Sequence, residues 1–130
     1  MKDTPKRLPD AELEVMKALW QDGEPLTRPE LEARLAQHHW ASTTLLALLA
    51  RLEAKGCVAR EKQGRGYLYR AALSRRDYLP VESRSALARL FEGSAKNLVA
   101  AMAESDALTD RDIAELEEYL AELKAGRGGT

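Results

Sequence analysis

Cationic side chains gather around a short glycine-containing turn near the middle of the chain. Arg60 and Lys62 precede the turn Gln63-Gly64-Arg65-Gly66, and Tyr67 follows it. Guanidinium and ammonium groups bind phosphate oxygens, and glycine permits the positive φ that a tight hairpin turn requires. Two strands are expected beside this turn, at 58–62 and 67–70. The pattern predicts a basic β-hairpin that is suited to contact a polyanion.

The charges of the chain are unevenly distributed, although its formal net charge is only −1. Over residues 51–76, eight basic residues stand against two acidic ones, which leaves a net charge of +6. Over residues 104–122, eight acidic residues stand against one basic residue, which leaves −7. The simpler interpretation is two solvated faces of opposite sign. Because the basic cluster coincides with the hairpin, nucleic-acid binding is favoured.

A helix is expected immediately before the hairpin, over about 42–55. Leucines recur at helical spacing and define one buried face: Leu45, Leu48, Leu49 and Leu52. Ser42 is expected to cap the N-terminus of this helix, because its hydroxyl can accept an unpaired amide. Lys55-Gly56 should end the helix, since glycine accepts the left-handed conformation at this position.

The opposite face of this helix carries small or uncharged side chains: Thr43, Ala47, Ala50 and Ala54, with Leu46 beside them. Such a face cannot make bidentate contacts to guanine, but it can lie close to base edges and touch thymine methyl groups. Thr43 and Thr44 stand at the helix N-terminus, where hydroxyls and free amides favour phosphate. The helix is therefore expected to enter the DNA major groove.

Two shorter helices should precede this one. Asp10 is expected to cap the first, and Thr27-Arg28-Pro29-Glu30 forms a capping box that opens the second, which should end near His38. Residues 1–8 are expected to form a frayed arm. The predicted core positions of these helices are Leu13, Met16, Leu19, Trp20, Leu31 and Leu35. Three helices followed by a hairpin indicate a winged helix-turn-helix domain over 1–72.

The inventory of catalytic and metal-binding side chains is nearly empty. Cys57 is the only cysteine and is expected to be a small buried hydrophobe. His38 and His39 point about 100° apart on a helix and are expected to be surface residues. We therefore expect no enzyme activity, no cofactor and no metal. No apolar run approaches the roughly 20 residues that cross a bilayer, and residues 1–7 lack a signal-peptide core; we expect no membrane insertion and a cytoplasmic location.

The chain beyond Arg70 is expected to form three helices, opened by Ser74, Ser94 and Thr109, with a kink or break at Pro80. The last should end at Gly126, with residues 127–130 disordered. Each helix carries an apolar stripe: Leu87, Leu90, Phe91, Leu98, Val99, Met102, Ile113, Leu116, Leu120 and Leu123. A unit this small buries too little surface to be stable alone. Residues 73–126 are therefore expected to form a helical dimerisation region.

The order of these segments resembles the penicillinase repressor family, the BlaI/MecI/CopY type of bacterial winged-helix repressors. The residues that carry the resemblance span nearly the whole chain: Leu8 to Met16, Trp20, Trp40 with Ser42-Thr43-Thr44, Leu48 to Gly56, Gly66 to Arg70, Phe91-Glu92-Gly93, Leu98-Val99 and Leu108 to Leu116. The resemblance implies a homodimer that binds a double-stranded operator as a transcriptional repressor, with the C-terminal helices joining the subunits. The expected DNA-binding residues are Thr27, Ser42, Thr43, Thr44, Leu46, Ala47, Arg51, Arg60, Lys62, Arg65 and Tyr67.

Two features depart from the family pattern. Family members that read well-known operators carry basic or hydrogen-bonding side chains on the exposed face of the recognition helix, whereas the matching face here has small side chains and only threonine hydroxyls as donors. In penicillinase repressors a protease cuts within the helix matching 94–104, and the matching bond here, near Ala101-Met102, lacks the usual asparagine–aromatic pair. The resemblance thus suggests a membrane sensor peptidase as a partner, whereas the absence of this pair argues against cleavage by such a peptidase. The alternative to a repressor is a winged-helix module that binds protein or RNA, which the bland helix face would suit.

Overall fold

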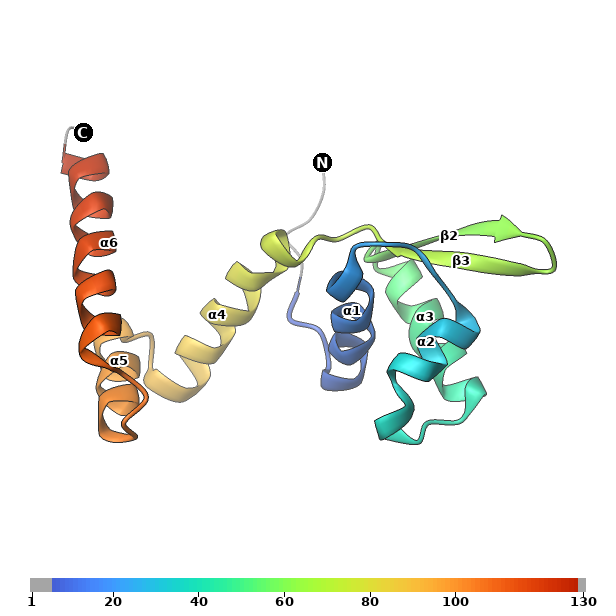
Figure 1. Cartoon of the computed structure of the whole chain (residues 1–130), viewed down its shortest axis with the longest axis horizontal. Coiled ribbons are helices and arrows are strands. Elements are labelled where there is room, and N and C mark those ends of the chain that lie inside the picture. The colour runs from blue at the N-terminus through green and yellow to red at the C-terminus, as the bar shows by residue number, and fades with distance from the viewer. Residues whose placement is uncertain (1–5, 129–130) are drawn as a thin grey trace. The chain divides into compact units, whose positions relative to one another are not determined.

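The computed structural model describes residues 6–128. It divides the chain into two compact units, one ending at Ser85 and the other beginning at Ala86. Both contain helices, and the small antiparallel sheet lies in the first (Figure 1). The mostly helical class with a hairpin is confirmed. The assignment of separate roles to residues 1–72 and 73–126 remains a prediction.

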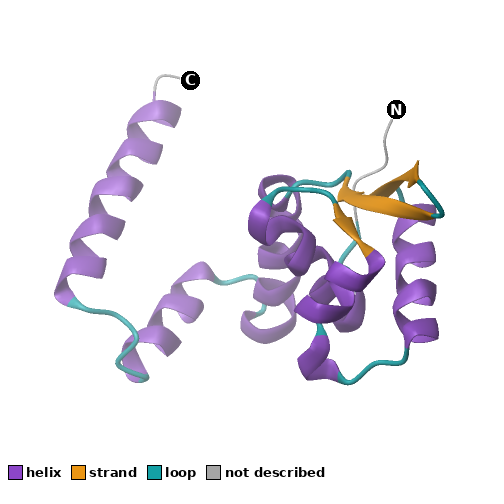
Figure 2. Ribbon diagram, turned by 45° about the vertical axis from the view of Figure 1, so that its right-hand side comes forward, coloured by secondary structure: helices purple, strands orange, loops and turns teal. Residues whose placement is uncertain are grey.

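The first unit places three helices beside a three-stranded sheet (Figures 1 and 2). Its elements are α1 (Asp10–Asp22), β1 (Leu26–Thr27), α2 (Arg28–Arg34), the 3₁₀ turn η1 (Ala36–His38), α3 (Ser42–Ala54), β2 (Val58–Gln63), β3 (Gly66–Ala71) and the start of α4 (Arg75–Phe91). The strand order is β1-β3-β2, and both pairings are antiparallel. The two predicted strands are confirmed, each slightly longer than expected, whereas β1 was not predicted.

Leucine dominates the core of this unit. The predicted buried face of α3 is confirmed, and Leu31 and Leu52 are fully buried. Leu13 and Trp20 pack at the edge of the core rather than inside it. Cys57 is buried as predicted, and this burial raises the pKa of its thiol. The core also includes Leu8, Val15, Ala18, Leu26, Val58, Tyr69 and Tyr78.

Two of the predicted helix caps are wrong. Helix α1 begins after Pro9, with no side-chain cap, and Asp10 is its first residue. Helix α3 begins after Ala41, so Ser42 lies inside the first turn. The Thr27 capping box is confirmed, because the Thr27 side chain accepts from the Glu30 backbone and the Glu30 side chain accepts from the Thr27 backbone. Accepting this N–H and the Thr27 hydroxyl lowers the pKa of the Glu30 carboxyl.

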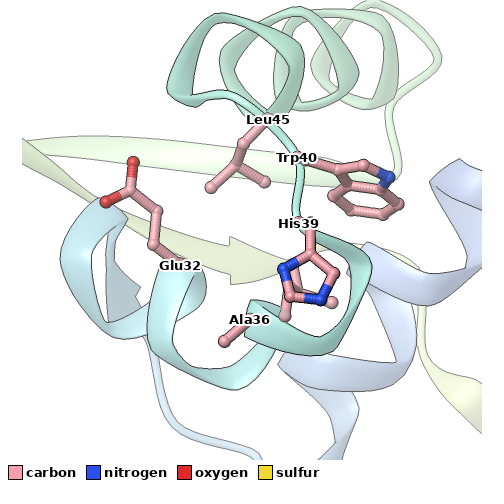
Figure 3. A pocket seen from close by; sticks show the side chains of 6 residues that line it. Glu32, Ala36, His39, Trp40 and Leu45 are labelled. Carbon is pink, nitrogen blue, oxygen red and sulfur yellow. The ribbon is translucent and has the colours of Figure 1, made fainter.

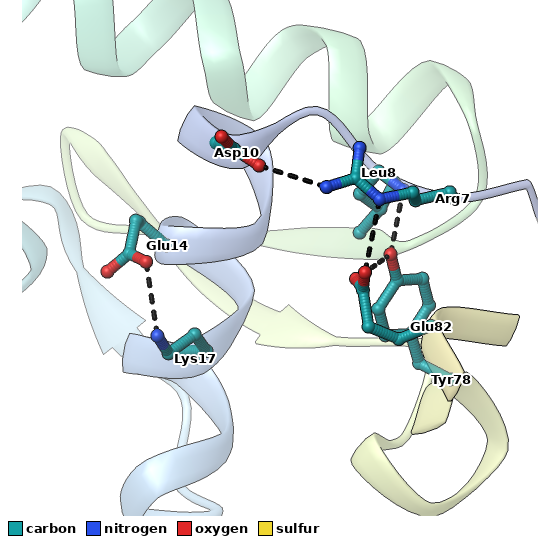
Figure 4. A network of polar contacts seen from close by, with 7 residues as sticks. All are labelled: Arg7, Leu8, Asp10, Glu14, Lys17, Tyr78 and Glu82. Carbon is teal, nitrogen blue, oxygen red and sulfur yellow. Dashed lines mark hydrogen bonds and ion pairs between the residues drawn. The ribbon is translucent and has the colours of Figure 1, made fainter. Parts of the chain in front are cut away.

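A polar network ties the N-terminal arm to the start of α4 (Figure 4). The Leu8 backbone N–H donates to the Tyr78 hydroxyl at 2.8 Å, and this hydroxyl donates to Glu82 Oε1 at 2.8 Å. Arg7 Nε donates to Glu82 Oε2 at 3.1 Å. Tyr78 is almost fully buried, and burial raises its pKa. The predicted frayed arm is thus wrong for Arg7 and Leu8, while residues 1–5 lie outside the described part.

The second unit contains the end of α4, then α5 (Ala95–Glu104) and α6 (Asp110–Gly128). Ser94 caps α5 as predicted, and Thr109 and Asp112 exchange two 3.0 Å hydrogen bonds at the start of α6. Helix α4 runs through Pro80 without a break. Helix α6 continues past Gly126, so residues 127 and 128 are helical and the predicted end is wrong. Residues 129–130 lie outside the description.

Apolar side chains of the second unit remain open to solvent. Exposed fractions range from 36% for Met102 to 66% for Leu90. The other large exposed apolar residues of this unit are Leu98, Val99, Ile113, Leu116, Tyr119 and Leu120. Leu87, Phe91 and Leu123 are half-buried. None of the helices between residues 6 and 128 has the length and apolar character that would let it span a bilayer.

Candidate nucleic-acid interface

Helix α3 presents a smooth face to solvent. Its leucines hold it against α1 and the sheet, so the opposite side is exposed: Thr43, Ala47, Ala50 and Ala54. Leu46 is 38% exposed on one flank, and Thr44 and Arg51 are exposed on the other. Because four of these side chains carry only a methyl or a short hydroxyl group, the helix backbone can approach a partner surface closely.

Ser42 takes a different role from the predicted cap. Its hydroxyl donates to Glu32 Oε2 at 2.7 Å, which joins the start of α3 to α2. Glu32 also lies 3.7 Å from Arg28 Nε. The hydroxyl of Ser42 therefore fixes the angle between the two helices of the helix-turn-helix, and it is already engaged.

The turn between α2 and α3 is stabilised by aromatic packing. The rings of His38 and Trp40 stack, with centroids 4.5 Å apart and planes 13° from parallel. His39 adopts a left-handed conformation with φ of 55° and ends the 3₁₀ turn. Figure 3 shows the small hollow that results, about 50 Å³ in volume and lined in part by His39, Trp40 and Leu45. It has room for a few water molecules at most.

The hairpin of β2 and β3 forms the wing, defined as residues 58–71. Gln63 pairs with Gly66, so the connection is a two-residue turn, and Gly64 takes φ of 59° at its first position. The tip of the hairpin extends beyond the helices of the unit (Figure 1). The pairing places Lys62 opposite Tyr67. These two side chains therefore lie on the same face of the wing.

The cations of the wing stack on Tyr67. The Arg60 guanidinium carbon lies 4.3 Å from the centroid of the Tyr67 ring, and Lys62 Nζ lies 5.0 Å from it. Arg60 Nε also lies 3.1 Å from Glu53 Oε2 at the end of α3. Arg65 at the tip is exposed and, among residues 6–128, makes no ion pair.

An open groove connects the wing with the helices. It is lined by three segments: Thr27, Arg28 and Pro29 at the start of α2, Leu46 on α3, and Arg60, Gln63, Arg65, Gly66, Tyr67 and Tyr69 on the wing. Five predicted DNA-binding residues thus meet here. Thr44, Ala47 and Arg51 lie outside this groove, on α3. Arg28 and Gln63 were not predicted, although Arg28 stands within the recognised capping box.

The charge balance of this surface favours a polyanionic partner. Arg28 sits in the first turn of α2, where the helix dipole disfavours a cation. Its ion pair with Glu32, at 3.7 Å, is loose. Lys55 is engaged elsewhere, since it pairs with the buried carboxylate of Glu12 on α1.

Among residues 6–128 no group of three or more histidine, cysteine or carboxylate side chains could hold a metal ion.

Comparison with known proteins places these observations in a family. The family model described as penicillinase repressor matches residues 8–122. A penicillinase repressor of Bacillus licheniformis is 34% identical over 124 residues, which cover 95% of this chain and 96% of the relative. The methicillin resistance regulatory protein MecI of Staphylococcus aureus (strain N315) is 26% identical over 85% of this chain and 89% of its own length.

Solved structures agree on the fold. The solution structure of the DNA-binding domain of the repressor BlaI is 34% identical, with a TM-score of 0.51; the match covers 61% of this chain and 95% of that domain. The crystal structure of apo MarR from E. coli has a TM-score of 0.50 and covers 89% of this chain and 77% of its own, but at 20% identity it shows only the fold. The open groove and the smooth face of α3 thus lie on a winged helix, and this chain belongs to the penicillinase repressor family.

Proposed function

We propose that this chain is a dimeric, sequence-specific transcriptional repressor that inserts α3 into the major groove of an operator. The observation that carries the proposal is the exposed face of small side chains on α3, flanked by the cationic groove of the wing. Membership of a repressor family and the likeness to the DNA-binding domain of BlaI support it. DNA as the partner also makes a cytoplasmic location the natural expectation.

Readout by α3 should be tolerant rather than strict. Ala47 and Ala50 leave room for base edges and thymine methyl groups, and Thr43 and Thr44 can donate hydrogen bonds near the helix N-terminus. No side chain on this face can form the bidentate contact that selects guanine. Specificity then depends on DNA shape and on the spacing of two half-sites.

The wing and the flank of α3 should supply affinity. Lys62, Arg65 and Arg51 carry exposed positive charges that suit phosphate, and such contacts position a domain without reading bases. Leu46 and Tyr67 line the same groove and would pack against sugars or methyl groups. Ser42 would contribute its backbone N–H group, because its hydroxyl is engaged within the protein. Thr27 would only line the groove, since its hydroxyl and its backbone N–H both donate to Glu30. We add Arg28 to the proposed DNA-contacting residues, because it also lines the groove.

A second copy of the chain is proposed to cover the open apolar faces of α4, α5 and α6. Leu90, Leu116 and Leu120 are exposed although they lie on helices whose stripes are regular. A sensor peptidase remains a further proposed partner. The bond between Ala101 and Met102 lies inside α5, and the helix would have to unwind locally before a protease could cut it.

The experiment that tests DNA binding compares two variants with the same chemical change. Ala47→Glu places a carboxylate at the centre of the proposed DNA-facing surface and should abolish binding to genomic DNA fragments. Ala33→Glu introduces the same charge on the exposed side of α2 and should leave binding unchanged. Affinity is measured over a series of salt concentrations, because phosphate contacts give a steep dependence.

Normal DNA binding by Ala47→Glu would show that α3 does not enter the DNA major groove. A shallow salt dependence in the wild type, together with capture of protein or RNA, would favour the interaction module instead. A steep dependence with loss of binding only in Ala47→Glu is the result that the repressor proposal requires.

A further inference from the structure

Arg60 links the recognition helix to the wing through two contacts at once. Its guanidinium meets the carboxylate of Glu53 in the last turn of α3 at 3.1 Å. The same guanidinium lies 4.3 Å above the Tyr67 ring on β3. Arg60 is therefore a group that joins Glu53 to Tyr67.

These contacts lie where the sheet becomes narrower. Strand β1 pairs only with Leu68 and Tyr69, so the sheet has three strands at that level and two beyond it. Arg60 is the register partner of Tyr69, on one of the two three-stranded levels, whereas Tyr67 lies just beyond them, in the two-stranded part. A two-stranded ribbon is marginally stable by itself and twists readily. A side-chain link at this level therefore limits how far the tip can swing relative to α3.

Lys62, two residues after Arg60 on the same strand, reinforces the arrangement. Its ammonium group lies 5.0 Å from the Tyr67 ring centroid, and the ring thus holds two cations. Both are attracted by the ring quadrupole and repel each other. The carboxylate of Glu53 offsets the charge of Arg60, which allows the two cations to share one ring.

We infer that Glu53, Arg60 and Tyr67 form a brace that sets the angle between the recognition helix and the wing, and that Arg60 is a positioning residue rather than a phosphate ligand. The inference rests on the proposed DNA-binding function. Phosphate contacts of the wing then come from Lys62 and from Arg65, which carries no ion pair among the described residues.

The brace predicts an unusual sign for one substitution. Glu53 is a carboxylate beside the proposed DNA surface, and simple electrostatics says that removing it should tighten DNA binding. If Glu53 instead holds Arg60, then Glu53→Ala should weaken binding. Glu61 is the matched control. It is an exposed carboxylate next to Arg60 on β2, and its side chain points to the opposite face of the wing from that of Arg60.

The experiment is a double-mutant cycle on the full-length chain. The probe is a duplex that the wild type enriches from a random-sequence pool, and affinity is measured at several salt concentrations. Glu53→Ala and Arg60→Gln should each weaken binding about fivefold, as expected for one good surface pair. The double variant should lose about the same factor, because both changes break one link. Glu61→Ala should bind as tightly as the wild type or more tightly.

The salt dependence separates positioning from phosphate contact. Arg65→Gln should reduce the slope by roughly one unit, whereas Arg60→Gln should leave it unchanged. Tighter binding by Glu53→Ala, additive losses in the double variant, or a reduced slope in Arg60→Gln would each overturn the inference.

A measurement without DNA distinguishes failure of the brace from failure of the proposed function. In the free protein, the side-chain protons of Arg60 should be shifted upfield by the ring current of Tyr67. Glu53→Ala should move these resonances toward random-coil values, while Glu61→Ala should not. Unchanged resonances in Glu53→Ala would overturn the brace. A wild type that enriches no duplex would instead overturn the repressor proposal. The Arg60 resonances would still show whether Glu53 holds Arg60 against Tyr67.

Discussion

The two units of this chain use leucine in opposite ways. In the first unit, Leu31 and Leu52 are 0% exposed. In the second, Leu116 is 37% exposed and Leu120 is 58% exposed. Both sets recur at helical spacing, and both lie on well-formed helices. The difference is what packs against each helix, because α3 meets α1 and the sheet, whereas the stripe of α6 stays open.

This contrast separates two kinds of information in a sequence. Helical periodicity predicts which side chains share a face. It does not predict whether that face is covered by the same chain or by another. The first unit closes its own core, so its stability should depend on single buried groups. The second leaves apolar faces open, so its stability should depend on protein concentration if the proposed dimer forms.

The largest effect on unfolding is expected for Leu52→Ala. This change leaves a cavity in a fully buried site and should lower the free energy of unfolding by about 2–5 kcal/mol. Urea denaturation of the full-length chain measures it. Leu46→Ala is the control, since Leu46 lies on the same helix and is 38% exposed. Equal costs for the two variants would show that burial in the first unit does not set its stability.

The next effect concerns the second unit. Leu116→Glu adds a carboxylate to an apolar stripe within an already acidic helix and should raise the dimer dissociation constant at least about a hundredfold, or roughly 3 kcal/mol. Light scattering across a dilution series measures it. Glu118→Gln changes an exposed residue of the same helix and should leave the dimer intact. A wild type that is monomeric at micromolar concentration would remove the basis of this comparison.

A smaller effect is expected when a buried polar group is removed from the first unit. Tyr78→Phe leaves the Leu8 backbone N–H without its acceptor and should cost about 1–3 kcal/mol. Tyr119→Phe is the matched control, because Tyr119 is 56% exposed on α6. Its cost should be close to zero. Thermal or urea unfolding at neutral pH compares the two.

The same pair of variants predicts a pH effect. Burial raises the pKa of Tyr78 above its ordinary value of 10.0. The folded state therefore holds this proton more tightly than the unfolded state, and the associated stability is lost as the pH rises above about 10. Tyr78→Phe should flatten the decline of stability above that pH, while Tyr119→Phe should retain it. An equally steep decline in Tyr78→Phe would contradict this assignment.

Local signals in the sequence were enough to predict most of the fold. The leucine face of α3 follows from spacing, and the caps at Thr27 and Ser94 follow from a hydroxyl three residues before the amide that it accepts. The hairpin follows from its glycine turn. Each of these features depends on groups within a few residues of one another, so a short window of sequence contains the cause.

Several of the errors involve partners that lie far apart in the chain. Ser42 does not cap α3, because Glu32, ten residues earlier, accepts its hydroxyl. Leu8 is isolated in the sequence, and it is buried because Tyr78 meets its backbone. The two-residue strand β1 forms only because β3 offers a free edge. No local pattern carries these contacts.

For the candidate site, the sequence predicted which residues take part but not what each of them contacts. The basic and aromatic residues of the wing could be identified from composition and position, and the structure brings several of them into one groove. The sequence did not indicate that Arg60 reaches Glu53 on the preceding helix. Arg28 was overlooked because its capping box explained the segment without it.

The burial of Cys57 makes this chain convenient for site-directed labelling. It is the only cysteine in the sequence, and burial both shields its thiol and raises the thiol pKa. Thiol reagents react with the thiolate, so the native residue should react slowly at neutral pH. A cysteine introduced at the exposed tip of the wing, for example Arg65→Cys, would then be labelled selectively. Spectroscopic probes could follow the wing without removal of the native cysteine from the core.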